Sequence, residues 1–198
     1  MNVVIFDYGV GNLYSLAEAF EACGARVRTE QTVGAALQGD ALVLPGVGAF
    51  SAAVVHLERD RAVLRAALLA GHPCLGVCLG MQLLFEGSAE GAGAGIGVLP
   101  GQVKPLRATC LPHMGWNDVD TGPDPLFDGA FGLNAYFAHS YAAVGLAPTN
   151  VIGWTTYDGE RFPAAVRRGR TWGVQFHPEK SGSDGWRLIS NFIKAVTP

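Results

Sequence analysis

The stretch Pro73–Phe85, PCLGVCLGMQLLF, joins an apolar, strand-like run to a helix-like run through a single cysteine. Gly76 and Gly80 flank that residue, Cys78, in the pattern glycine–any–nucleophile–any–glycine. This pattern forms a sharp, strained turn between a strand and a helix, and the small flanking residues let backbone and neighbours approach closely. The sequence therefore predicts that Cys78 lies on an elbow at a helix N-terminus, where the helix dipole and free N–H groups favour a thiolate.

The alternative is that Cys78 is a small buried hydrophobic residue, which is the commonest fate of a free cysteine. That interpretation fits Cys23, Cys74 and Cys110, and we expect those three to pack rather than react. It leaves the two glycines beside Cys78 unexplained, because each glycine weakens a strand or helix interior by roughly 0.5–1 kcal/mol. A zinc site built on His72, Cys74 and Cys78 is disfavoured, since no second ligand pair has suitable spacing.

Strand and helix patterns alternate through the first half of the chain. Residues 2–6 (NVVIF) and 41–46 (ALVLPG) are short apolar runs of the kind that is buried on both faces of a sheet. Helical spacing follows Asn12 and Asp60, each of which can cap a helix. The alternation predicts an α/β fold of three layers, with a mostly parallel central sheet and helices on both faces. In the second helix the predicted inward residues are Val63, Leu64, Ala67 and Leu68.

The second half of the chain carries closely spaced strand patterns, which predict an antiparallel or mixed extension of the sheet. These are residues 135–141, 151–157, 164–168 and 172–177. Before them, residues 87–101 are rich in glycine and small side chains, which suggests a mobile surface loop. An amphipathic helix closes the chain, with Trp186, Ile189 and Ile193 expected to face the core. No linker divides the sequence, so residues 1–198 are expected to form one domain.

Composition argues against several classes of partner. Fourteen basic residues stand against 17 acidic ones without a basic stripe, so we expect no nucleic-acid partner. Residues 66–85 are apolar enough to resemble a membrane span, but Gly71, Pro73 and Gln82 break them into shorter elements, and we expect no membrane partner. The absence of a secretory start and the irregular spacing of four cysteines indicate a reduced, cytoplasmic protein.

His177 and Glu179 are the best candidates for the base that a reactive thiol needs and for the group that orients this base. They lie in WGVQFHPEKS, after a strand-like run, and Pro178 favours extended backbone at His177. Positions two apart in an extended segment point to the same side, so Glu179 can stand beside the imidazole. A lone histidine after a strand is more often structural. His113 and His139 lie in loop-like, aromatic-rich stretches and can line a site without transferring protons.

Acyl transfer also needs backbone N–H groups that stabilise a negatively charged oxygen. One expected donor is the N–H of Leu79, and the other comes from the loop LPGVGAF, at Gly46, Val47 and Gly48. A phosphate-binding loop is the alternative, and DYGVGN at residues 7–12 raises it as well. Neither loop completes a nucleotide-binding fingerprint, so we expect no cofactor.

In this chain order, the glycine loop, the cysteine elbow and the His-Pro-Glu sequence resemble the class I (triad) glutamine amidotransferases over essentially the whole chain. The resemblance is carried by DYGVGNLYSL, LPGVGAF, GVCLGMQLLFE, HMGWN, YFAHSY and GVQFHPEKS. Met81 follows Gly80 where many other glutaminases carry histidine, and this makes the chain similar to the glutaminases that serve a barrel-shaped cyclase. YSL after Asn12 and SGSDGW after Lys180 differ from the sequence typical of the family, but neither stretch contains a catalytic residue.

The resemblance implies a role for each motif. Cys78 attacks the side-chain amide of glutamine, His177 shuttles the proton, and Glu179 orients His177. Gly46, Val47 and Gly48 match the oxyanion strand. The positions that match substrate-binding residues are Gln82, Glu90, His139, Ser140 and Tyr141, and those that match partner contacts are Asn12, Tyr136 and Lys180.

The implied partner is a (β/α)8-barrel cyclase subunit that uses the ammonia, and a heterodimer is expected because this chain is too short to contain that barrel. Three alternatives remain open. The chain could be a glutaminase of the same fold that serves anthranilate or aminodeoxychorismate synthase, although Met81 and HMGWN argue against this. It could also be a stand-alone cysteine hydrolase, or a non-catalytic scaffold subunit.

Overall fold

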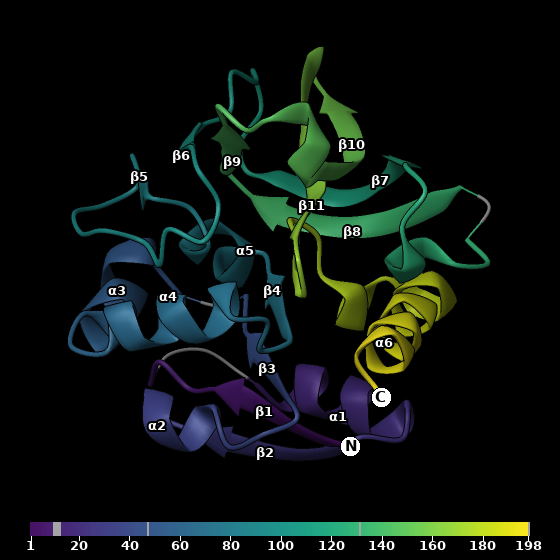
Figure 1. Cartoon of the computed structure of the whole chain (residues 1–198). Helices are drawn as coiled ribbons and strands as arrows, with labels where there is room; N and C mark the ends of the chain where they lie inside the picture. Colours follow the sequence, from purple (N-terminus) through teal and green to yellow (C-terminus); the bar gives the residue numbers. More distant parts are fainter. Residues whose placement is uncertain (10–12, 47, 131, 198) are drawn as a thin grey trace.

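The computed structural model describes residues 1–9, 13–46, 48–130 and 132–197. Within it, a nine-stranded sheet runs through the protein (Figure 1). Across the sheet the strands are β2 (Arg26–Glu30), β1 (Asn2–Phe6), β3 (Ala41–Leu44), β4 (Cys74–Val77), β12 (Thr171–Val174), β11 (Glu160–Arg168), β10 (Val151–Tyr157), β7 (His113–Thr121) and β8 (Leu133–His139). The first five are parallel, and from β12 onward neighbouring strands are antiparallel. The predicted parallel sheet with an antiparallel extension is confirmed.

Helices cover both faces of the parallel strands (Figure 1). One face carries α1 (Tyr14–Ala22) and α6 (Gly182–Val196), and the other carries α3 (Phe50–Leu57), α4 (Arg61–Leu69) and α5 (Leu79–Leu83). Because side chains alternate along a strand, β1 supplies both hydrophobic cores: Ile5 packs with the first and Phe6 with the second. Three layers result, as the sequence predicts. The remaining helical elements are α2 (Val33–Ala36), η1 (Pro125–Phe127), η2 (Pro148–Asn150) and η3 (Pro178–Lys180).

The expectation of a surface loop at residues 87–101 is confirmed only in part, because residues 89–94 are irregular and at least partly exposed whereas the rest of the segment is tied to the core. This segment starts with β5 (Gly87–Ser88), which joins β6 (Gln102–Pro105) and β9 (Tyr141–Val144) in a second, three-stranded sheet. Its apolar residues Ile96, Val98 and Leu99 are buried in the second core. Several of its glycines answer a packing demand, since a Cβ added at Gly95 would collide with the carbonyl of Phe85.

Three details of the predicted helices also need correction. In α4, Leu64 and Leu68 are buried but Val63 is exposed, and the Asp60 side chain makes no capping hydrogen bond. In α6, Trp186 is 44 % exposed, and the buried face is formed instead by Gly185, Leu188, Ile189, Phe192 and Val196. The N-cap of α1 is Leu13, and Asn12 lies outside the described residues. No helix in the described ranges is long and apolar enough to cross a membrane.

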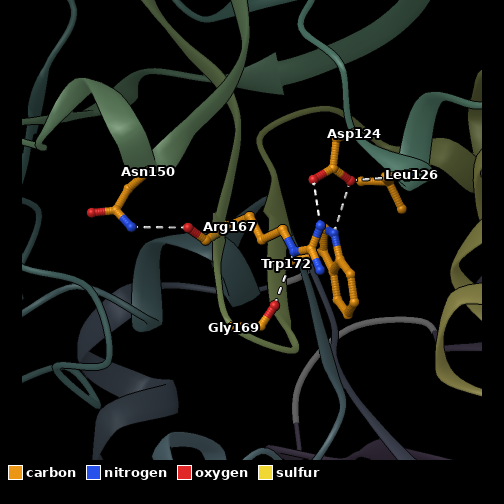
Figure 2. Close-up of polar contacts among 6 residues, drawn as sticks. All are labelled: Asp124, Leu126, Asn150, Arg167, Gly169 and Trp172. Atoms are coloured by element: carbon orange, nitrogen blue, oxygen red, sulfur yellow. Dashed lines mark hydrogen bonds and ion pairs between the residues drawn. The ribbon is translucent and has the colours of Figure 1, made fainter.

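The carboxylate of Asp124, which is buried, ties the antiparallel strands to the segment after β7 (Figure 2). Its Oδ1 accepts hydrogen bonds from the backbone N–H of Leu126 at 2.9 Å and from the indole N–H of Trp172 at 3.1 Å. Its Oδ2 pairs with the guanidinium of Arg167 at 2.8 Å, and this group lies 4.5 Å from the centre of the Trp172 ring. Both oxygens are therefore engaged, and the arrangement joins η1 to β11 and β12.

Candidate active site

Cys78 lies on the predicted elbow, between the end of β4 and the start of α5. Its backbone angles are φ 48° and ψ −102°, a strained conformation for a residue other than glycine. The flanking glycines are required by space: a Cβ at Gly76 would lie 2.6 Å from the carbonyl oxygen of Gly80, and a Cβ at Gly80 would collide with the carbonyl of Leu44. The sequence prediction of an elbow is confirmed, and its physical cause is the tight packing of β4, α5 and β3.

Two cysteines four positions apart on this segment have different surroundings. Cys74 is completely buried within β4, and burial raises the pKa of its thiol far above the usual range. Cys78 reaches a cavity and is 6 % exposed. The expectation that Cys74 packs in the core is confirmed, whereas Cys110 is exposed and Cys23 partly so.

His177 and Glu179 form a buried pair, with 2.8 Å between the imidazole Nδ1 and the carboxylate Oε1. Glu179 lies beside the imidazole as the sequence predicts, but an extended segment is not the cause. His177 is extended, at φ −102° and ψ 98°, yet Pro178–Lys180 form the 3-10 turn η3, and it is this turn that brings the carboxylate back to the ring. The second carboxylate oxygen, Oε2, has no hydrogen-bond partner within the described ranges.

Burial alone would lower the pKa of His177, but the hydrogen bonds and negative charges of Cys78 and Glu179 outweigh it and raise the pKa to about 10. Gly46 lies between the two functional groups: a Cβ added there would be 2.9 Å from the Cβ of Cys78 and 3.0 Å from Cε1 of His177. The imidazole can therefore hold a proton beside the sulfur, and a thiolate is the nucleophilic form of cysteine.

A cavity of about 100 Å³ opens beside Cys78. Its lining includes all five residues predicted to bind substrate and three of the four predicted to form the oxyanion site: Gly46, Gly48, Cys78, Leu79, Gln82, Glu90, Ala138, His139, Ser140 and Tyr141. Val47 lies outside the described residues. Gly48 has a φ of +106°, a conformation that favours glycine. The fold thus brings together residues from four separate stretches of the sequence around one sulfur.

Gln175 is a site residue that sequence reasoning missed. It is completely buried just beyond the end of β12, and its side-chain Nε2 lies 3.5 Å from the sulfur of Cys78. Its Oε1 accepts a hydrogen bond from Nε2 of Gln82 at 3.1 Å. A signal was present in the sequence, because Gln175 is two positions before His177 in an apolar run and therefore points toward the same side.

His139 and His113 lie on the paired strands β8 and β7, not in loops as expected. His139 Nδ1 is 2.8 Å from the carbonyl oxygen of Tyr141, and its Nε2 is 3.2 Å from Nδ1 of His113. Burial lowers the pKa of His139 to about 3 and that of His113 to about 4. Both rings are neutral near pH 7, which agrees with the prediction that they line a site without transferring protons.

Tyr136 and Lys180, two of the predicted partner contacts, lie together, with the Lys180 ammonium 5.9 Å from the centre of the Tyr136 ring. The backbone of Tyr136 is joined to His177 by three hydrogen bonds. The His177 N–H donates to the Tyr136 carbonyl at 2.8 Å, the Tyr136 N–H donates to the Ser181 hydroxyl at 2.9 Å, and this hydroxyl donates to the His177 carbonyl at 2.6 Å. Trp116, whose ring centre is 6.2 Å from that of Tyr136, is more than half exposed.

Comparison with known proteins agrees with this geometry. The family model described as "Glutamine amidotransferase class-I" matches residues 4–196. The chain is 44 % identical to "Imidazole glycerol phosphate synthase subunit HisH" of Leifsonia xyli, with 98 % of each chain covered. It is 45 % identical to the protein of that name from Salinibacter ruber, with 98 % of this chain and 94 % of the relative covered.

Similar solved structures support the fold alone, because their sequence identities are low. A structure titled "Crystal structure of glutamine amidotransferase" superposes with a TM-score of 0.79 at 18 % identity, covering 98 % of both chains. "Structure of PurLQS from Thermotoga maritima" gives a TM-score of 0.76 at 20 % identity and 99 % coverage of both chains.

Proposed function

This chain belongs to the class I glutamine amidotransferase family, and we propose that it is the glutaminase subunit of an imidazole glycerol phosphate synthase, acting in histidine biosynthesis. The observation that carries the proposal is the meeting of Cys78 and the His177–Glu179 pair beside one small polar cavity. Relatives of similar length, 44–45 % identical, bear the name of that subunit, which favours this synthase over one that makes anthranilate or aminodeoxychorismate.

The proposed reaction proceeds through a thioester. The sulfur of Cys78 attacks the side-chain amide carbon of glutamine and forms a tetrahedral intermediate with a negatively charged oxygen. His177 donates its proton to the amide nitrogen, the C–N bond breaks, and ammonia leaves a glutamyl thioester. His177 then takes a proton from water, which attacks the thioester carbon and releases glutamate, returning the sulfur to its starting state. Glu179 holds the imidazole in orientation through both steps.

The negatively charged oxygen needs donors that are already in place. The backbone N–H of Leu79, the first residue of α5, is one such donor, and the helix N-terminus adds favourable partial charge. The Gly46–Gly48 loop, whose two glycines also line the cavity, supplies the second. Val47, which lies between these glycines, remains part of the proposal, as in the sequence prediction.

The cavity lining suits the polar ends of glutamine. Glu90 is partly buried at the cavity and offers a carboxylate for the ammonium group of the substrate. Gln82 already donates both hydrogens of its amide nitrogen, to Tyr141 and Gln175, which leaves its Oε1 to accept from the substrate. His139, Ser140 and Tyr141, at the junction of β8 and β9, supply the segment along which the substrate lies.

The proposed partner is a separate (β/α)8-barrel cyclase subunit in a cytoplasmic heterodimer, with neither nucleic acid nor membrane involved. Exposed aromatic and apolar side chains near Tyr136 and Lys180, among them Trp116 and Met114, fit a protein contact. The Ser181-centred hydrogen bonds join this surface directly to the backbone of His177. A movement of Tyr136 on partner binding would therefore be transmitted directly to the backbone of His177, the proposed base. Asn12 is retained as a proposed contact on sequence grounds.

Substitution Cys78→Ser tests the proposed function in the complex with the cyclase. We expect loss of at least about 1,000-fold in glutamine-driven product formation, with ammonia-driven formation unchanged, because the cyclase does not need the thiol when ammonia is supplied. Mass spectrometry should detect a glutamyl adduct on Cys78 in the unsubstituted chain. Glutamine-driven activity that is retained in Cys78→Ser would indicate a scaffold role. Hydrolysis by the unsubstituted chain that needs neither glutamine nor the cyclase would indicate another cysteine hydrolase.

A further inference from the structure

We propose that Gln175 is a further catalytic residue, whose side-chain amide donates a hydrogen bond to the reactive sulfur of Cys78. The donor Nε2 lies 3.5 Å from Sγ, within hydrogen-bonding range for sulfur. The Gln175 side chain is completely buried, so water does not compete for this contact. The inference rests on the proposed function for the identity of the substrate, whereas the contact with the sulfur is independent of it.

The orientation of the Gln175 amide follows from a chain of hydrogen bonds that begins at a backbone carbonyl. The carbonyl oxygen of Tyr141 only accepts, so the Gln82 atom that lies 3.2 Å from it must be the amide nitrogen. This nitrogen has no acceptor capacity, so the Gln175 atom 3.1 Å away must be the acceptor, Oε1. The remaining end of the Gln175 amide, its N–H donor, therefore faces the sulfur.

Backbone hydrogen bonds hold both Gln175 and Cys78 in place. The Gln175 N–H donates to the carbonyl of Ala164 on β11 at 2.8 Å, which continues the sheet beyond β12. Cys78 is held by its own N–H, which donates to the carbonyl of Val174 at 2.7 Å. The amide and the sulfur are thus attached to adjacent, paired strand ends.

A neutral amide N–H cannot exchange a proton with the thiol, so its role differs from that of His177. It stabilises the sulfur while it carries negative charge and fixes the direction from which the sulfur approaches the substrate. Stabilising a thiolate also weakens it as a nucleophile, with a Brønsted coefficient of about 0.4–0.5. A tenfold increase in the fraction of Cys78 that is ionised therefore increases the rate of nucleophilic attack only about threefold. Correct orientation of the sulfur adds to this gain.

The test compares the unsubstituted chain with Gln175→Met, which keeps the size of the side chain and removes the donor. Alkylation of Cys78 by iodoacetamide is followed as a function of pH, and mass spectrometry of the Cys78 peptide separates it from Cys23 and Cys110. Gln102→Met serves as the matched control, because Gln102 is exposed on β6. Glutamine hydrolysis is measured with the same proteins in complex with the cyclase.

In Gln175→Met we expect the pH midpoint of Cys78 alkylation to rise by about one pH unit, as the loss of a hydrogen bond to a charged group implies. The kcat for glutamine hydrolysis should fall about tenfold with little change in KM, and Gln102→Met should match the unsubstituted chain. An unchanged midpoint overturns the inference, whether or not activity falls. If the midpoint rises but no protein hydrolyses glutamine, the inference stands and the proposed function fails.

A measurement on the unsubstituted chain covers the case in which Gln175→Met does not fold. The side-chain amide protons of Gln175 are followed by NMR as Cys78 ionises or is alkylated. Because a hydrogen bond to sulfur strengthens when the sulfur becomes charged, we expect one of the two amide proton resonances to move with the alkylation midpoint and to lose that dependence after alkylation. Resonances that do not respond to the state of Cys78 overturn the inference.

Discussion

Two buried carboxylates, Asp124 and Glu179, have very different surroundings. Asp124 uses both oxygens, accepting from a backbone N–H and an indole N–H and pairing with the Arg167 guanidinium (Figure 2). Glu179 uses one oxygen, toward His177 at 2.8 Å, and its other oxygen is unpaired among the residues that the structure describes. Both oxygens of the first carboxylate are engaged, whereas within the described ranges the second carboxylate engages only one.

This difference separates a structural cluster from a reactive one. The partners of Asp124 come from η1, β11 and β12, so its hydrogen bonds hold three elements in one arrangement. Among the described residues, Glu179 instead has one carboxylate oxygen without a partner, and nearby Cys78 has a strained backbone at φ 48°. Unsatisfied groups and backbone strain concentrate at functional sites because the chemistry needs free capacity there.

Substitution Glu179→Gln should give the largest effect and sharpen the contrast. The amide keeps the shape of the side chain but no longer stabilises a charged imidazole or fixes its tautomer, so we expect glutamine hydrolysis in the complex to fall by about 100- to 10,000-fold. The loss of unfolding free energy, measured in urea, should be smaller than for Asp124→Ala, because the glutamine amide can still accept a hydrogen bond from His177 Nδ1. The exposed Glu58→Gln is the control. A large loss of stability with retained activity would make Glu179 a second structural carboxylate.

Substitution Asp124→Ala should show the opposite pattern. It leaves the buried Trp172 N–H without its acceptor and the Arg167 guanidinium, whose side chain is 33 % exposed, without its carboxylate, so we expect a loss of about 1–3 kcal/mol of unfolding free energy. The kcat of the folded fraction should stay within about twofold, because none of the residues that Asp124 contacts lines the Cys78 cavity. Urea unfolding measures the loss, with the exposed Asp128→Ala as control. A loss below about 1 kcal/mol would contradict the role assigned to this cluster.

The smallest effect is a change in the protonation of His177. Its pKa is raised to about 10 because the contacts with Cys78 and Glu179 outweigh burial, so the imidazole should remain protonated at pH 8. In Cys78→Ser the sulfur's hydrogen bond and charge are removed while burial still lowers the pKa, so the His177 pKa should fall. NMR titration of the His177 Cε1–H resonance in the two proteins measures the difference. An unchanged titration would show that the sulfur and the imidazole are not coupled.

The sequence predicted those parts of the site in which a local rule determines the structure. Gly76 and Gly80 predicted the elbow because only a close-packed turn requires a residue without Cβ on both sides of Cys78. The apolar runs of β1, β3 and β4 predicted buried parallel strands because both of their faces are covered. The resemblance to known glutaminases then identified the cavity lining, which spacing alone does not give.

Where long-range packing determines the structure, the sequence was misleading. The glycines of residues 87–101 look like loop residues, but they permit close packing, and Ile96, Val98 and Leu99 are buried in the second core. Trp186 fits an inward helical position, but the face of α6 that meets α1 and the sheet is set by Leu188 and Phe192. Hydrophobic spacing defines an apolar face but not the neighbour that covers it.

The sequence by itself determined the class of fold, the strained cysteine and the presence of a histidine with a carboxylate two residues later. Only the tertiary structure decided which groups touch the sulfur. His177 reaches it across Gly46, and Gln175 reaches it through an amide whose direction is fixed by Gln82 and Tyr141. The physical reason is range: turn strain and strand burial act between neighbours in the chain, whereas the polarity of a hydrogen-bond chain depends on every residue that the fold brings into it.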